Sequence, residues 1–128
     1  MRDLSTDEVS DLVYETLEIL NYEEVLTNPT TGSIFPCLEL HPPLKQVNKT
    51  QNAFPISSSF QVSITCHNES QRKCMEMSHQ VDGELQKINF TRTITSPSIF
   101  NTITKKYGIT VTYEVRYNSI TNSFEFIR

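Results

Sequence analysis

The sequence predicts an α+β fold, with an antiparallel or mixed β-sheet, two main helices packed on one face, and a C-terminal β-hairpin. Two amphipathic segments with helical periodicity and two segments with strict alternation predict it. The chain has 128 residues, of which 37% are hydrophobic and 20% are charged. This size and composition fit a single folded domain over residues 1–128.

The first helix is predicted from its cap and its two faces. Ser5 and Glu8 have the spacing of a capping box, and the helix should end near Asn21, before a turn cluster at 28–32. One face is apolar: Val9, Leu12, Val13, Leu17 and Leu20. The opposite face is acidic: Asp7, Glu8, Asp11, Glu15 and Glu18.

A strand is predicted over 34–41, and two prolines after His41 should end it. Residues 42–57 are polar and interrupted by proline, which is typical of a long surface loop. We expect this loop to be mobile in the free protein, with Lys45 and Lys49 in solvent.

The next strand runs directly into the second helix. Apolar and polar residues alternate over 60–66, which predicts a strand with one buried face. Residues 68–71 should cap the helix, with Gln71 in the capping-box position. Gly83 either ends this helix or weakens it. The predicted buried stripe comprises Cys74, Met77, Val81, Leu85 and Ile88.

The last third of the chain predicts mostly strands. Residues 90–94 form a short strand, and Ser96 followed by proline opens a short helix. That helix would carry Ile99, Phe100 and Ile103. Strict alternation over 109–117 and the aromatic segment 124–127 then predict a β-hairpin.

One cluster of residues has a metal-like composition: Cys66, His67, Cys74 and His79. Zinc needs ligands that converge on one point. Successive side chains of a strand point to opposite faces, so Cys66 should point toward the core and His67 away from it. Cys74 and His79 are five positions apart on a helix and should point in different directions. We therefore expect no metal, and cysteines that act as small core residues.

Catalytic motifs are not evident either. Cys66 and Cys74 lie in apolar stripes, Cys37 has no catalytic neighbours in sequence, and His41 is interpreted as a strand-end residue. Phosphate-binding glycine motifs and serine-hydrolase motifs do not occur. We therefore expect a protein without enzymatic activity or cofactor. Replacing any of the three cysteines should change the stability of the fold and no chemical activity. The densest basic segments, 105–106 and 72–73, are interpreted as solvated tips rather than a sequence-specific nucleic-acid interface.

Charge is distributed unevenly along the chain. The net charge is −4, but residues 1–44 carry one base and nine acids, whereas residues 45–128 carry ten bases and six acids. This asymmetry indicates either a plain acidic surface helix or complementary faces that meet between copies in a ring. Under the second interpretation, Glu15 and Glu18 lie at a subunit contact.

The sequence also gives expectations about compartment and surface. It has no long apolar run and no basic leader before an apolar stretch, so we expect no membrane span and a cytosolic protein with reduced thiols. The polar face of the C-terminal hairpin is either solvent surface or part of a subunit contact. Its residues are Thr110, Thr112, Glu114 and Arg116.

Four segments together carry a family resemblance. They are the acidic helix ending in ILNYEEVLTNP, the strand IFPCLELHPP, the strand and helix SSFQVSITCHNESQRKCMEMSHQVDGEL, and the closing hairpin GITVTYEVRYNSITNSFEF. In this order the chain resembles the tail-terminator, or tail-completion, proteins of long-tailed phages. The resemblance covers nearly the whole chain without a diagnostic motif.

The resemblance implies a non-enzymatic virion protein. Such a protein forms a ring, commonly a hexamer, caps the finished tail tube, ends tail polymerisation and offers a surface for head attachment. Its partners are further copies of itself, the tail tube protein and head–neck proteins, and its location is the host cytoplasm during assembly and then the virion tail. By topology, the 42–57 loop would face the lumen or a partner through Lys45, Asn48, Lys49 and Asn52.

Other functions remain open from the sequence. In the same class, the chain fits another small phage neck, tail or baseplate protein. In a different class, it fits a small ferredoxin-like α+β enzyme, a monomeric inhibitor or a ligand-binding module. A monomer with a deep pocket favours the second class, and a ring with a central hole favours the terminator.

Overall fold

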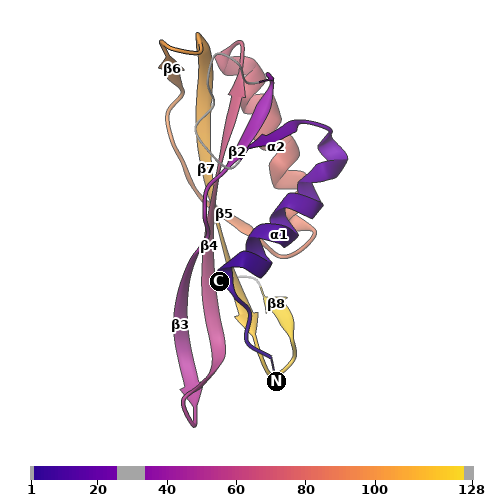
Figure 1. The fold of residues 1–128 in the computed structure, drawn as a ribbon, viewed down its shortest axis with the longest axis vertical. Helices are drawn as coiled ribbons and strands as arrows, with labels where there is room; N and C mark the ends of the chain where they lie inside the picture. The colour runs from indigo at the N-terminus through magenta and orange to yellow at the C-terminus, as the bar shows by residue number, and fades with distance from the viewer. Residues whose placement is uncertain (1, 26–33, 126–128) are drawn as a thin grey trace.

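Two helices lie together on one face of a long twisted sheet (Figure 1). The structure is a computed structural model that describes residues 2–25 and 34–125. The predicted α+β class is confirmed. The sheet is mixed, because β1 pairs with β2 in parallel while the other described pairs are antiparallel.

The elements follow one another in the order α1 (Thr6–Leu17), the 3₁₀ turn η1 (Glu18–Leu20), β1 (Glu23–Val25), β2 (Cys37–Leu40), β3 (Leu44–Gln51), β4 (Phe54–Asn68), α2 (Gln71–Gln86), β5 (Thr91–Thr95), β6 (Ile99–Asn101), β7 (Lys106–Asn118) and β8 (Ser123–Glu125).

The sheet is built around β4 and β7, which pair from Ser57–Asn118 to Asn68–Tyr107. Along both strands, alternate side chains point toward the helices and form the core. The predicted inward rows are confirmed as buried: Phe60, Val62, Ile64 and Cys66 on β4, and Ile109, Val111, Tyr113, Val115 and Tyr117 on β7.

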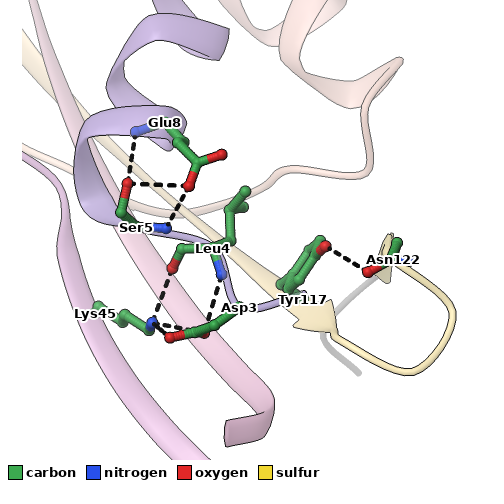
Figure 2. Close-up of polar contacts among 7 residues, drawn as sticks. All are labelled: Asp3, Leu4, Ser5, Glu8, Lys45, Tyr117 and Asn122. Atoms are coloured by element: carbon green, nitrogen blue, oxygen red, sulfur yellow. Dashed lines mark hydrogen bonds and ion pairs between the residues drawn. The ribbon is translucent and has the colours of Figure 1, made fainter. Parts of the chain in front are cut away.

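Helix α1 begins at the predicted capping box, which the structure confirms (Figure 2). The Glu8 amide donates to the Ser5 hydroxyl at 3.2 Å, and the Ser5 amide donates to the Glu8 carboxylate at 3.3 Å. The helix ends through η1 at Asn21, whose φ of 59° lies in the left-handed region that terminates helices. Three residues of the predicted apolar stripe are fully buried: Val9, Val13 and Leu17.

Helix α2 buries the predicted stripe, with Ile88 half-buried at its end. The predicted role of Gln71 was wrong, because Ser70 is the N-cap and accepts the Lys73 amide at 3.2 Å. Gln71 is therefore the first residue of the helix. It is too close to the cap for its side chain to bond the backbone amide of the N-cap residue, as the third helical residue does in a capping box. Gly83 lies inside the helix rather than at its end.

A polar group fixes α2 against the sheet from within the interface. Asp82 on α2 accepts from the Tyr113 hydroxyl on β7 and from the Arg92 guanidinium on β5, the latter at 2.7 Å. Burial, and then the contact with Asp82, raise the pKa of the Tyr113 hydroxyl, so it stays a donor. One carboxylate therefore joins three elements.

The predicted loop over 42–57 was wrong, because these residues form a β-hairpin. Strand β3 pairs with β4 from Leu44–Gln61 to Gln51–Phe54. The turn consists of Asn52 and Ala53, whose φ values are 52° and 63°. Two successive positive φ values are typical of the two-residue hairpin turn that follows the twist of its strands.

The hairpin also changes the prediction for its lysines. Lys45 does not extend into solvent, since its ammonium lies 2.8 Å from Asp3 Oδ1 and donates to the Leu4 carbonyl at 2.8 Å (Figure 2). This contact holds the N-terminal segment against β3, so that Leu4 is buried. Lys49 is exposed as predicted.

Four further features differ from the prediction. Residues 96–103 contain strand β6 instead of a helix, because Ile99, Phe100 and Asn101 pair with β7. The strand predicted over 34–41 is shorter, and β1 was not predicted. The strand predicted over 90–94 runs one residue later. The turn cluster at 28–32 and the hairpin residues 126–127 lie outside the described residues.

The hairpin turn predicts the effect of one substitution. A left-handed conformation costs an alanine roughly 1–2 kcal/mol, and glycine avoids this cost while losing somewhat more backbone entropy on folding. Ala53→Gly should therefore raise the free energy of unfolding by about 1 kcal/mol in urea denaturation. Ser57→Gly, on an extended position of the same hairpin, should lower it. A destabilised Ala53→Gly protein would contradict the assigned turn.

Candidate functional site

On the side of the sheet that points away from the helices, β2, β4 and β7 carry a block of mostly polar side chains, and we call this block the polar face. Its side chains alternate with the core residues along the strands, and the register places them opposite one another. Its members are Glu39, His41, Gln61, Ser63, Thr65, His67, Thr110, Thr112, Glu114 and Arg116.

Hydroxyl groups on the polar face pair across the strands. The oxygens of Ser63 and Thr112 lie 2.9 Å apart, and those of Thr65 and Thr110 lie 2.7 Å apart. His41 adds to this row of hydrogen bonds, because its Nε2 lies 2.8 Å from the Thr65 hydroxyl oxygen. Because these groups satisfy one another, this part of the face is stable in water without a partner.

A buried acid–histidine pair lies at one end of this face. Glu39 is 6% exposed and His67 is 7% exposed, and Glu39 Oε1 lies 2.9 Å from His67 Nε2. The carboxylate accepts, so this ring nitrogen carries the hydrogen. The second Glu39 oxygen lies 3.8 Å from His41 Nδ1.

Gly108 and Phe35 both pack closely against the His67 ring. A side chain on Gly108 would place its Cβ 3.4 Å from His67 Nδ1, so the glycine leaves room for the ring. Phe35 contacts the other side edge-on, with ring centroids 6.4 Å apart. His67 Nδ1 is buried and has no hydrogen-bond partner among the described residues.

Cys37 lies opposite His67 in the β2–β4 register. Burial, then the charges of Glu39 and Glu23, raise the pKa of the Cys37 thiol to about 11. At neutral pH the sulfur is therefore a protonated thiol, which is a poor nucleophile. Burial likewise raises the pKa of Cys66 to about 12.

The residues of the metal-like cluster are separated by the sheet. Cys66 and Cys74 are buried under the helices, His67 belongs to the polar face, and His79 is exposed on α2. Over residues 2–25 and 34–125, no three histidine, cysteine or acidic side chains are placed to share a metal ion.

A second candidate site is an acidic cleft at the end of α1, of about 290 Å³. It is lined by Tyr14, Glu18, Asn21, Tyr22, Glu23 and Glu24. Burial, and then the charge of Glu18, raise the pKa of the Glu24 carboxyl to about 7. Glu24 Oε1 is buried without a hydrogen-bond partner in the described part of the chain. The described lining of this cleft therefore contains carboxylates and no positive group.

The predicted interface residues lie on two separate surfaces. Glu15 and Glu18 are exposed on the acidic side of α1 and η1. The hairpin residues lie on the polar face, where Thr112 is buried, Thr110 and Glu114 are half-buried and Arg116 is exposed. A subunit contact through Glu15 and Glu18 stays a prediction, and for the hairpin residues both alternatives, solvent surface and subunit contact, stay open.

The residues assigned to a lumen-facing loop belong to the β3–β4 hairpin. Lys45 is bound to Asp3, and Asn48 donates to the Ser59 hydroxyl at 2.6 Å. Lys49 is exposed, and Asn52 forms the turn. Their proposed partner contacts stay predictions, now on a strand edge instead of a loop.

The Glu39–His67 pair was missed from the sequence. Glu39 and His41 alternate with Leu38 and Leu40, which was a signal that both point away from the core. Sequence alone does not give the β2–β4 register that brings His67 beside them.

Comparisons with known proteins add no assignment. No protein-family model and no curated protein matches the chain. Among the described residues, no helix is long and apolar enough to cross a membrane.

Removing the Glu39 carboxylate should destabilise the fold. Glu39→Ala leaves a buried imidazole N–H without its acceptor, which should lower the free energy of unfolding by about 2 kcal/mol. Glu39→Gln retains an acceptor oxygen and should lose about half as much in the same urea titration. Equal losses for both variants would show that the hydrogen bond does not stabilise this edge of the sheet.

Glu24 should make stability depend on pH. Its folded pKa, about 7, lies above the value of 4.5 for a free carboxyl. Between these values the folded protein holds more proton than the unfolded chain, so this group's stabilising contribution is lost as pH rises from about 4.5 to 7. Glu24→Gln should therefore melt higher than wild type at pH 8, with a smaller difference at pH 5. The exposed neighbour Glu23, changed to Gln, is the control, and an equal pH response in both variants would contradict the assignment.

Proposed function

We propose that the chain is a structural ring subunit without enzymatic activity, which caps a phage tail tube, ends tail polymerisation and provides the surface for head attachment. The observation that carries this proposal is the contrast between a hydrogen-bonded polar face and two sheet edges that no described strand covers. Such a subunit associates with its own copies through its edges and keeps its polar face in water.

The uncovered edges are long enough to pair with a strand of another subunit. Strand β3 pairs with β4 on one side, and none of the described strands pairs with its other side. At the opposite edge, β5, β6 and β8 have β7 as their only partner within the described ranges. Unpaired edges present rows of backbone donors and acceptors, which favour pairing with another chain.

The charge distribution also supports assembly from identical copies. A head-to-tail contact joins two different patches of one subunit, and it closes into a ring when the rotation between copies allows. The acidic side of α1 and the more basic composition of residues 45–128 are compatible with a contact between surfaces of opposite charge.

A mass measurement tests this function. The subunit has a mass of 14.7 kDa. Light scattering on the size-exclusion eluate should give a discrete particle of several subunits whose mass stops increasing with protein concentration. When added to polymerising tail tube protein, this particle should shorten the tubes. A monomer over the whole concentration range, or a polymer without a limiting mass, would contradict the ring.

A further inference from the structure

The β5–β6 edge of the sheet and the turn after β6 expose four large apolar side chains, and we call this region the apolar edge. By register, Ile94 and Ile99 lie on the same side of the sheet as the polar face, whereas Phe100 lies on the helix side, opposite Tyr107. The exposed fractions are 58% for Ile94, 65% for Ile99, 46% for Phe100 and 71% for Ile103. These four residues fall within ten positions of the chain. Exposed apolar groups gathered in this way usually mark a binding surface.

The tip of this edge is held in a defined conformation. Asn101 Oδ1 accepts the Ile103 amide at 2.9 Å, and the Lys105 amide donates to the Asn101 carbonyl at 2.7 Å. Phe100 contacts Tyr107 edge-on, with ring centroids 5.1 Å apart. The turn therefore presents Ile103 and the exposed Lys105 together at a fixed place.

The acidic cleft has the complementary properties. Its lining includes Tyr14, which is 41% exposed, and Ile19, which follows the lining residue Glu18 in the sequence, is 68% exposed. Its carboxylates include the buried Glu24 oxygen that has no hydrogen-bond partner among the described residues. The tip of the apolar edge offers apolar side chains and the positive charge of Lys105. The cleft offers the aromatic ring of Tyr14 and carboxylates with no positive group in its described lining, so the two surfaces are complementary.

We infer that the apolar edge of one copy docks on the acidic cleft of the next copy, with Lys105 placed against Glu18. This inference rests on the proposed ring. The two surfaces lie on opposite sides of the molecule, with β6 at the upper left and α1 at the right of Figure 1. Each subunit therefore offers one surface to each neighbour, as head-to-tail closure requires.

Charge complementarity selects a second copy as the occupant. The apolar edge carries Lys105 and Lys106, whereas the region around the cleft carries Glu15, Glu18 and Glu23. A tail tube or head protein on the apolar edge is the competing occupant, and charge reversal separates it from a second copy.

Paired charge reversals test the contact, because like charges oppose docking and opposite charges restore it. Lys105→Glu and Glu18→Lys should each weaken self-association about tenfold at low salt, measured by sedimentation equilibrium. An equimolar mixture of the two variants should recover assembly, since a docking between unlike variants can again join a glutamate with a lysine. Both positions are exposed, so both variants should fold. Glu18→Lys also removes a charge that raises the pKa of Glu24, so its melting temperature should equal or exceed that of wild type.

Two controls make the result specific. Lys87→Glu, at the residue that caps the C-terminal end of α2, reverses an exposed charge that pairs with Glu84 of the same subunit, and it should leave assembly unchanged. Ile99→Ser with Ile103→Ser should weaken assembly without rescue by any charge variant.

The outcomes separate the two proposals. If wild type assembles and the mixture does not recover, the docking is wrong while the ring stands, and the apolar edge is left to another protein. Normal assembly of each variant alone would likewise overturn the docking and leave the ring. If wild type remains monomeric at all concentrations, both proposals fail.

Discussion

The pairing of β4 with β7 is the constraint on which the rest of the structure depends. Their register sorts every side chain of two long strands to one of two faces. A shift of β4 by one residue would turn Phe60 away from the helices and Gln61 toward them, and a shift of β7 would do the same to Val111 and Thr112. The helices cover the apolar row, and Asp82 fixes α2 there through Tyr113 and Arg92. The other row is left as a polar face that is hydrogen-bonded across the strands.

This division determines where binding is expected. Cross-strand hydrogen bonds on the polar face leave few groups that need a protein partner, and the Glu39–His67 pair is buried within the same face. The apolar edge and the acidic cleft are different. The first exposes large apolar side chains to water, and the second contains a buried Glu24 carboxylate oxygen without a hydrogen-bond partner among the described residues. The proposed ring uses these two surfaces and leaves the hydrogen-bonded residues of the polar face in water.

Local sequence patterns correctly predicted those elements that are determined by neighbouring residues. The capping box of Ser5 and Glu8 and the alternation on β4 and β7 each depend on neighbouring residues, and each is confirmed. The β3–β4 hairpin was missed because its turn is Asn-Ala rather than the usual Asn-Gly, and because prolines precede it. The capping signal before β6 wrongly predicted a helix, since pairing with β7 overrides local propensity. Glu39 meets His67 only through long-range register, which no local pattern encodes.

Electron cryo-microscopy of the purified oligomer tests the central claim most directly. We expect a closed ring in which β6 of each subunit contacts α1 of the next, while Thr110, Glu114 and Arg116 face solvent. A symmetric pair of subunits that buries the polar face against itself would contradict this arrangement, because the hydroxyl pairs and the Glu39–His67 pair would then be part of an interface.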